Sequence, residues 1–360
     1  MTQSAEKTEK GGVAGKVQGL SLSKILLEGR AFIAFLAIIA VFAWLSPNYL
    51  TLDNLVVMSR HVALNALLAL GMLLVILKGG IDLSVGSTVG LGGVLAGFML
   101  MQGVTIPGVD KVLYPKVWVV IVVTLLFGAL IGLINGILVT RFNVAPFIAT
   151  LGMLYVVRGV ALLIAHGETY PDLQGKPALG NTGFHVVGLG KFLGLPTGIW
   201  VMIIVALAIS FLLRKTVFGR WLYALGGNER AAELSGVPIH RVKRWVYVIS
   251  GICAAATGLI IASELTAGAP QTGQSFELNA IAAVVIGGAA LSGGRGNVRG
   301  TLLGAFVIGF LSDGLVIVGV SDFWQMVIMG SVIIFAVALD ESQQKAKKRN
   351  FSKSLGKTKK

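Results

Sequence analysis

Ten long apolar segments dominate this chain of 360 residues and limit what it can fold into. A helix needs ~20 apolar residues to cross the ~30 Å of hydrocarbon in a bilayer, and these segments contain 14 to 23 residues each. Only 13% of the residues are charged, about half the share in soluble domains, which need a polar surface. Soluble, disordered and coiled-coil proteins are therefore excluded, and the sequence predicts an all-α polytopic membrane protein. The segments are Ala31–Leu45, Val62–Leu77, Val85–Met101, Val117–Val139, Ala145–Ala165, Gly198–Leu213, Trp245–Ser263, Leu278–Leu291, Thr301–Val318 and Phe323–Leu339.

The expected fold has about ten transmembrane helices, some of them broken by glycine. The segment Val85–Met101 is rich in glycine, and Leu278–Leu291 is short. Irregular backbone inside a membrane is tolerated only where protein or a water-filled path surrounds it. We therefore expect these two segments to be broken or re-entrant.

The distribution of basic residues predicts the orientation of the chain. If the N-terminus is cytoplasmic and the ten segments alternate in direction, 24 of the 30 Lys and Arg residues lie inside and five outside. Cytoplasmic segments are enriched in Lys and Arg, so both termini are expected in the cytoplasm. The N-terminal tail is then residues 1–30 and the transmembrane domain 31–340, with a cytoplasmic loop at 214–244. A basic C-terminal tail occupies 341–360.

The net charge of +14 follows mostly from this orientation. A nucleic-acid-binding surface would interleave basic with aromatic residues. Both tails lack that pattern, so no nucleic-acid partner is expected. We expect the segment 345–360 to lie near the anionic lipid of the inner leaflet. With Cys253 as its single cysteine, the chain forms no internal disulfide.

The chain repeats a glycine pattern at an offset of 214 residues. Both copies read Leu-Asn-Ala, an apolar run, Gly-Gly, five residues, glycine, a hydroxyl residue, and glycine again after a short spacing. Matching Gly-interrupted segments in two halves indicate the solute pathway of a transporter, although small residues also serve helix packing. Both interpretations stay open. The predicted pathway residues are Asn65, Gly79, Gly80, Asp82, Ser84, Asn279, Gly293 and Gly294.

Asp82 is the most unusual of these residues, because it lies between two apolar segments. A carboxylate there is costly unless it caps a helix, pairs or meets water. After the helix-breaking pair Gly79-Gly80, either Asp82 or Ser84 is suited to cap a helix that begins near Val85. Capping is favoured over direct contact with a solute.

The large inner loop carries the end signals of a short helix. Asn228 is a good N-cap, Glu229 suits the positive end of the helix dipole, and Gly236 suits the left-handed position after the last turn. A helix between them is ~10 Å long and marginal in water alone. We expect its small face, which carries two adjacent alanines, to dock against a partner, while a merely ordered connection remains the alternative.

Four motifs resemble those of the ribose-type permeases of ATP-binding-cassette importers. They are GGIDLSVGS at 79–87, TLGMLYVVRG at 150–159, GGNERAAELSGV at 226–237 and AVVIGGAALSGGRGNVRGTLLG at 283–304. The resemblance extends from about residue 50 to 339, with the motifs in family-like order. It implies a multi-pass inner-membrane permease that pairs with a second permease subunit, identical or different. It also implies cytoplasmic ATPases that drive transport, and a periplasmic binding protein that delivers a monosaccharide (a pentose or hexose) or a related polyol.

The third motif resembles the short helix by which importer permeases engage a groove on the ATPase. The wider importer pattern has its glutamate directly before the two alanines, whereas Arg230 intervenes here, as in the sugar branch. Arg158 matches the Arg-Gly pair of the family and is expected to be structural. The residues that the resemblance assigns to this coupling helix are Asn228, Glu229, Ala231, Ala232 and Gly236.

Motifs for other chemistries are missing from the sequence. The nearest approach to the phosphate-binding loop G-x-x-x-x-G-K-[ST] is at 356–358, with Phe351 where the first glycine is required. We expect no enzyme activity, no cofactor and no metal, and energy supplied by another subunit or by an ion gradient. An ion-coupled secondary transporter of a small polar solute is the alternative, although its only acidic candidates are Asp82, Glu264 and Asp313. The histidines, which show no metal-ligand spacing, are His61, His166, His185 and His240.

Overall fold

The computed structural model describes residues 30–105 and 111–357, and the predicted N-terminal tail lies almost wholly outside them. Each apolar segment predicted from the sequence overlaps a helix, although the eighth continues through residues 287–291 beyond the end of its helix. Seven helical segments are long and apolar enough to cross a membrane, and three shorter apolar helices accompany them in the described part of the chain. The all-α membrane class is therefore confirmed at this level. The main helices are α2 (Arg30–Leu45), α3 (Leu52–Leu77), α4 (Val85–Gly97), α5 (Val117–Arg141), α6 (Pro146–Ile164), α8 (Thr197–Lys215), α9 (Val217–Gly227), α10 (Glu229–Leu234), α11 (Ile239–Glu264), α12 (Phe276–Ile286), α13 (Val298–Ile317) and α14 (Asp322–Lys357).

Short elements complete the fold. A π-helical turn, η1 (Phe98–Gln102), continues α4, and η2 (Pro177–Leu179) and α7 (Val186–Leu189) lie between α6 and α8. Two small antiparallel hairpins pair β1 (Val104–Thr105) with β2 (Val112–Leu113) and β3 (Lys191–Phe192) with β4 (Leu195–Pro196).

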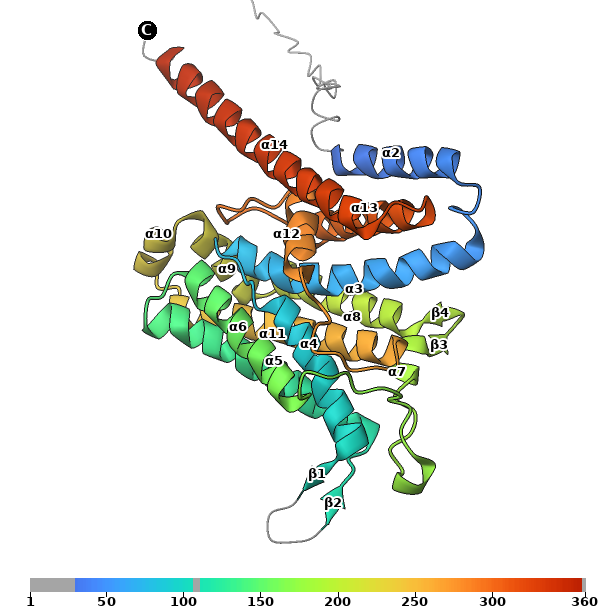
Figure 1. Cartoon of the computed structure of the whole chain (residues 1–360). Coiled ribbons are helices and arrows are strands. Elements are labelled where there is room, and N and C mark those ends of the chain that lie inside the picture. Colours follow the sequence, from blue (N-terminus) through green and yellow to red (C-terminus); the bar gives the residue numbers. More distant parts are fainter. Residues whose placement is uncertain (1–29, 106–110, 358–360) are drawn as a thin grey trace, which may run out of the picture.

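The central helices α3, α8 and α11 run side by side, as Figure 1 shows. The β3–β4 hairpin lies at one end of the molecule and α9 and α10 lie at the other, which we refer to as the α10 end. Helices α4, α5 and α6 pack beyond α11, and α2 and α13 lie on the opposite side of α3.

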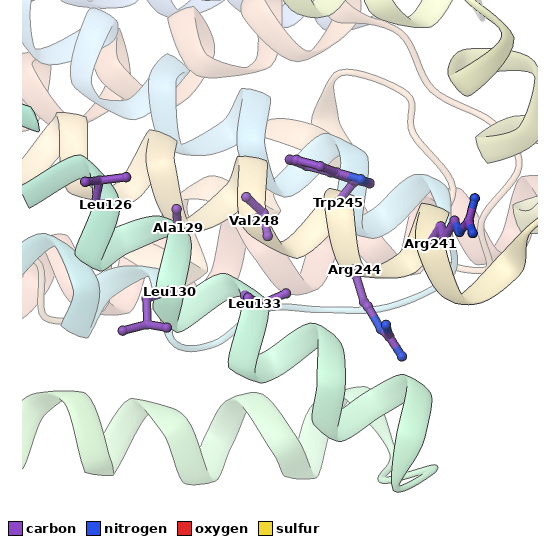
Figure 2. A pocket seen from close by; sticks show the side chains of 8 residues that line it. All are labelled: Leu126, Ala129, Leu130, Leu133, Arg241, Arg244, Trp245 and Val248. Carbon is purple, nitrogen blue, oxygen red and sulfur yellow. The ribbon is translucent and has the colours of Figure 1, made fainter.

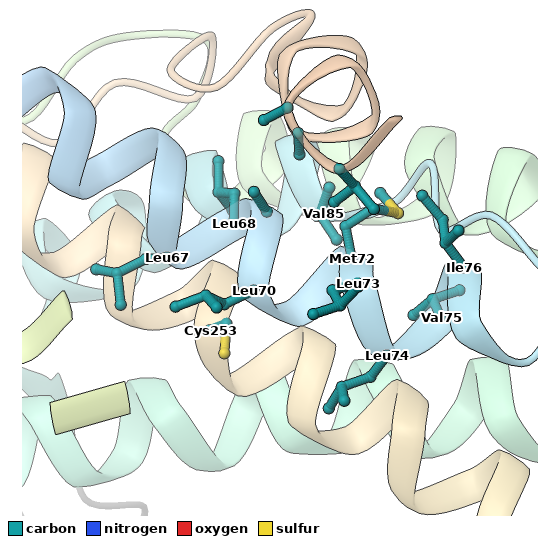
Figure 3. Packing of buried hydrophobic residues seen from close by; sticks show 14 of the residues in the cluster. Leu67, Leu68, Leu70, Met72, Leu73, Leu74, Val75, Ile76, Val85 and Cys253 are labelled. Carbon is teal, nitrogen blue, oxygen red and sulfur yellow. The ribbon is translucent and has the colours of Figure 1, made fainter. Parts of the chain in front are cut away.

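The core is built around α3, which is apolar on every side from residue 66 to 77. A helix that is apolar all round is stable only when other elements surround it. Here α8, α11, α12 and α13 all pack against it. Figure 3 shows Leu70 of α3 beside Cys253 of α11. At this crossing a Cβ on Gly71 would lie 3.1 Å from the Cys253 Cβ, so the two helices approach closely.

The two segments expected to be irregular behave differently. The segment at 85–101 is not broken, because α4 is continuous and only its last turn becomes π-helical. Its glycines serve close packing, since a Cβ on Gly97 would lie 2.6 Å from the Tyr170 side chain. By contrast, α12 contains only 11 residues and leads into a loop at 287–297.

The inner loop contains more structure than the sequence predicted. Helix α9 fills 217–227, and α11 begins at Ile239, six residues before the predicted apolar segment. The Thr216 hydroxyl accepts the Gly219 amide at 3.3 Å and caps α9. Two short helices, α9 and α10, therefore connect α8 to α11, and residues 235–238 between α10 and α11 are not helical.

Candidate functional site

The short helix α10 forms with the caps that its sequence predicted. The Asn228 side-chain oxygen accepts the Ala231 amide at 3.0 Å. At the other end, Gly236 adopts a φ of +81°, and the Val237 amide donates to the Ala232 carbonyl at 3.1 Å. These bonds satisfy backbone groups that a six-residue helix otherwise leaves free. The caps therefore hold α10 in a defined shape.

The exposed side chains of α10 differ from the small face proposed from the sequence. Of the two predicted alanines, Ala231 is exposed, whereas Ala232 is only 4% exposed and packs within the chain; Leu234 is 77% exposed. Glu229 forms an ion pair of 2.6 Å with Lys243 of α11, and Arg230 pairs with Glu233 at 3.0 Å. The available surface therefore consists of Ala231, the charged side chains and one protruding leucine.

Three pairs of adjacent glycines meet at the α10 end. They are residues 79–80 after α3, 226–227 at the end of α9, and 293–294 between α12 and α13. The Gly294 amide donates to the Leu77 carbonyl at 2.9 Å. We refer to these three pairs as the glycine junction.

No side chain fits at the centre of the glycine junction. A Cβ on Gly226 would overlap the Leu77 carbonyl and lie 2.5 Å from the Gly294 nitrogen. A Cβ on Gly293 would lie 2.9 Å from both the Gly226 oxygen and the Gly79 nitrogen. Gly293 also has a φ of +89°, which strongly favours glycine. Because α9 leads directly into α10, the α9–α10 segment and both copies of the repeat are in contact.

A tyrosine adds a second connection at the same place. The Tyr223 hydroxyl of α9 donates to the Gly296 carbonyl at 2.7 Å. Burial raises the pKa of Tyr223 above its ordinary value, so the hydroxyl stays a hydrogen-bond donor. The loop of the second copy is therefore held to α9 by a side chain as well as by glycine packing.

Asp82 holds the loop of the first copy together. Its carboxylate is 1% exposed and accepts the Ser84 amide at 3.0 Å, the Ser84 hydroxyl at 2.6 Å and the Ser250 hydroxyl of α11 at 3.1 Å. The Asn135 amide of α5 donates to the Ser84 oxygen at 2.9 Å. Helix α4 begins at Val85, as predicted, but the predicted side-chain cap is not formed, because Ser84 at the N-cap donates its hydroxyl to Asp82 and accepts no amide of the first turn. With three donors on the carboxylate, Asp82 connects α4 to α11 in a structural role.

Residues 266–275 form an irregular segment between α11 and α12 that the sequence did not indicate as a site. It follows α4 at close range, because a Cβ on Gly90 would lie 2.8 Å from the Pro270 and Thr272 oxygens. A Cβ on Gly93 would lie 3.7 Å from Gly268, and one on Gly86 would overlap the Gly273 carbonyl. From Gly93 to Gly86 the contact covers ~10 Å of helix. The segment therefore runs beside a helix that is long enough to cross a membrane.

Arg158 of α6 fixes this irregular segment. Its guanidinium donates to the Pro270 carbonyl and, at 3.0 Å, to the Thr272 carbonyl. These hydrogen bonds satisfy carbonyls that have no helical partner, as backbone inside a membrane requires. Gln271, Gln274 and Ser275 remain exposed. The segment thus presents polar side chains between apolar helices.

The remaining predicted pathway residues are not gathered at one point. Asn65 lies on α3 and Asn279 on α12, both partly buried, and neither side chain forms a hydrogen bond within the described residues. Gly79, Gly80, Gly293 and Gly294 belong to the glycine junction. The polar segment 266–275 has no hydrophobic period, so periodicity missed it. The shortness of the eighth apolar segment was the available signal.

Comparison with known proteins identifies the family. The family model for the permease component of branched-chain amino acid transport systems matches residues 54–337. Ribose import permease protein RbsC of Escherichia coli (strain K12) is 40% identical over 326 residues, which are 89% of this chain and 95% of the relative. The protein of the same name from Bacillus subtilis (strain 168) is 43% identical over 312 residues, 87% of this chain and 92% of that protein.

A further relative is named for another sugar. Xylose transport system permease protein XylH of Escherichia coli (strain K12) is 33% identical over 378 residues, covering 89% of this chain and 93% of the relative. No solved structure matches the chain. The chain belongs to the ribose-type permeases of ATP-binding-cassette importers, multi-pass proteins of the bacterial inner membrane.

Proposed function

We propose that this chain forms the membrane pathway for a monosaccharide, a pentose or hexose, or a related polyol. A periplasmic binding protein delivers the solute, and separate ATPase subunits bind α10 and drive transport. Relatives named for ribose and xylose support a small sugar. In this proposal ten helices cross the membrane, both termini and α10 are cytoplasmic, and a second permease subunit completes the pathway.

One observation carries the proposal: α10 is connected through the glycine junction to both copies of the repeat. A force applied to α10 reaches Gly226, which contacts Leu77 and Gly294 directly. Leu77 ends α3, and Gly294 lies in the loop before α13. ATP hydrolysis in partner subunits therefore has a short mechanical route to the membrane helices. The glycines transmit motion in this view, and the solute contacts lie elsewhere.

The solute contacts are assigned to the irregular segment 266–275. Sugar hydroxyl groups exchange hydrogen bonds with water for hydrogen bonds with polar side chains, and Gln271, Gln274 and Ser275 are exposed in this segment. An amide side chain both donates and accepts, which matches a polyol without requiring a charge. Irregular backbone at this depth is also expected to line a water-filled path.

Reconstitution in liposomes tests the class of transporter. Sugar uptake should require ATP, the binding protein and the ATPase chains together. Uptake by this chain alone under a proton gradient would contradict the proposal and favour an ion-coupled transporter.

Coupling through α10 is tested by Glu229→Lys and Leu234→Ser. The first replaces the partner of Lys243 with a like charge, and the second removes the 77% exposed leucine. Both should reduce transport-linked ATPase stimulation by about tenfold, the effect of losing ~1.4 kcal/mol of contact energy. Leu193→Ser is the matched control, because Leu193 is also 77% exposed but lies in the β3–β4 turn. Equal losses in Leu234→Ser and Leu193→Ser would show that α10 has no special role.

The solute contacts are tested by Gln271→Ala combined with Gln274→Ala. Uptake should fall while ATPase stimulation by the binding protein persists, because the coupling route is intact. The exposed Gln102 of η1 provides the control Gln102→Ala. Unchanged uptake in the double variant would place the solute path elsewhere.

A further inference from the structure

A groove between α5 and α11 combines apolar and basic side chains and lies outside the proposed transport site. It has a volume of about 590 Å³. Figure 2 shows Leu126, Leu130 and Leu133 on the α5 side and Arg241, Arg244 and Trp245 on the α11 side. One end is therefore apolar, and the other carries two guanidinium groups.

Close packing of the two helices creates this shape. The ridge of Gly128, Gly132 and Gly136 on α5 lies against the α11 backbone, and a Cβ on Gly136 would lie 2.8 Å from the Arg244 Cα. Small residues at this spacing let membrane helices approach closely. The larger side chains beside the ridge stay uncovered, with Leu126 62% and Leu130 48% exposed.

Arg244 is held in place at the basic end. Its Nε donates to the Thr140 hydroxyl at 3.0 Å, while Arg241 is exposed. The acidic residues nearby on α10 are engaged with other cations, Glu229 with Lys243 and Glu233 with Arg230. The two arginines therefore lack a carboxylate partner within the described residues.

We propose that this groove binds one anionic phospholipid of the inner leaflet, with its phosphate at Arg241 and Arg244 and an acyl chain along the leucines. The orientation comes from the proposed function, which puts the α10 end in the cytoplasm. From Leu133 to Leu126 the apolar wall extends ~10 Å into the hydrocarbon. Trp245, 59% exposed, occupies the boundary that amphipathic indoles favour. Basic pockets between membrane helices on the cytoplasmic side bind anionic head groups by charge complementarity.

Trp245 provides the measurement. The full chain is placed in phosphatidylcholine vesicles that contain a minor fraction of either brominated phosphatidylglycerol or brominated phosphatidylcholine. The fluorescence difference between the chain and Trp245→Phe isolates quenching of this indole. Quenching should favour phosphatidylglycerol by about thirtyfold, since each basic residue near anionic lipid contributes about fivefold. Neither ATPase nor sugar is present, so the result does not depend on transport activity.

Three variants decide the outcome. Arg241→Gln should lower the preference for phosphatidylglycerol about fivefold and leaves the hydrogen bond of Arg244 intact. Ala129→Phe fills the groove and should lower quenching by both lipids. Arg295→Gln with Arg299→Gln changes two exposed arginines, one in the loop before α13 and one in its first turn, and should leave the preference unchanged. Equal quenching by the two lipids, or an equal loss in the control, overturns the proposal. Absence of quenching by both lipids also overturns it, and shows that a second copy of the chain covers the groove.

Discussion

The two copies of the repeat share a glycine pair but differ at the end far from it. In the first copy, α3 is helical from residue 52 onward. At the offset of 214, residues 52–61 correspond to 266–275, which is the irregular segment before α12. Gly268, Pro270 and Gly273 lie in this stretch, and glycine and proline are the residues that most disfavour a helix. The second copy is therefore irregular where the first is helical, and exposed Gln271, Gln274 and Ser275 lie in this irregular stretch.

The shared glycine pairs and the stretch that differs between the two copies have different surroundings. The glycine pairs of both copies meet at α9, where they are packed against backbone. The segment at 266–275, by contrast, is polar and partly exposed. The common part is suited to transmit movement, and the part that differs is suited to contact solute.

The largest expected effect comes from breaking what the two copies share. Gly226→Val places a side chain on the Leu77 carbonyl and the Gly294 amide. Since these neighbours are backbone atoms, the unfolding free energy should fall by more than about 3 kcal/mol, the upper range for overpacking. Uptake should be lost. Denaturation by dodecyl sulfate in mixed micelles measures the unfolding free energy, and the liposome assay measures sugar uptake.

The neighbouring glycine is the control for this variant. A Cβ on Gly227 would meet nothing within 4 Å, and the residue is exposed. Gly227→Ala should therefore keep both stability and uptake. If the two variants behave alike, the close contact at Gly226 is not what holds the copies together.

A smaller effect is expected from loosening the first copy alone. Asp82→Ala removes the acceptor for the Ser84 amide and for the Ser84 and Ser250 hydroxyls. Buried donors left without an acceptor should lower the unfolding free energy by about 2–3 kcal/mol. Denaturation in mixed micelles measures this loss. Asp82→Asn keeps an acceptor oxygen and should lose less; an equal loss would mean that these hydrogen bonds are not the source of stability.

The irregular segment of the second copy should respond to Arg158→Met. This change removes the donors for the Pro270 and Thr272 carbonyls, and bonds to a charged group contribute about 1.5–3 kcal/mol. Part of that loss is offset because a costly charge also leaves the membrane. Hydrogen exchange should accelerate within 266–275 and stay unchanged at 52–61, the helical counterpart. Equal exchange at both places would remove the distinction between the copies.

The sequence predicted the helices better than their contacts. Apolar runs located each membrane helix, and Asn228 and Gly236 located α10, because span length and capping are local properties. The meeting of Leu77, Gly226 and Gly294 depends on how three distant segments pack, and no local pattern contains that information. Glycine itself was ambiguous, since it serves both breaks and close packing.

The irregular segment 266–275 and the exposed leucine of α10 were not predicted from the sequence, for related reasons. Residues 266–275 have no hydrophobic period; the short apolar segment that follows them was the signal in the sequence, and comparison with the helical counterpart at 52–61 makes them stand out. On α10, sequence reasoning favoured the adjacent pair Ala231 and Ala232 because both are small. Ala231 is exposed, but Ala232 packs inward and Leu234 protrudes. Which face of a short helix is free depends on its neighbours, here α9 and α11.

The smallest expected effect distinguishes the two ways in which the loops are held. Tyr223→Phe removes only the bond to the Gly296 carbonyl, and a neutral hydrogen bond contributes about 1 kcal/mol.

Position 296 corresponds to Asp82 at the offset of 214, so Tyr223→Phe and Asp82→Ala loosen equivalent places in the two copies. Tyr223, however, belongs to α9, whereas Asp82 bonds to its own loop and to α11. Compared with Asp82→Ala, Tyr223→Phe should therefore cause a larger loss of ATPase stimulation for a given loss of unfolding free energy. If both variants change stability and stimulation in the same ratio, the second copy has no special connection to the coupling segment.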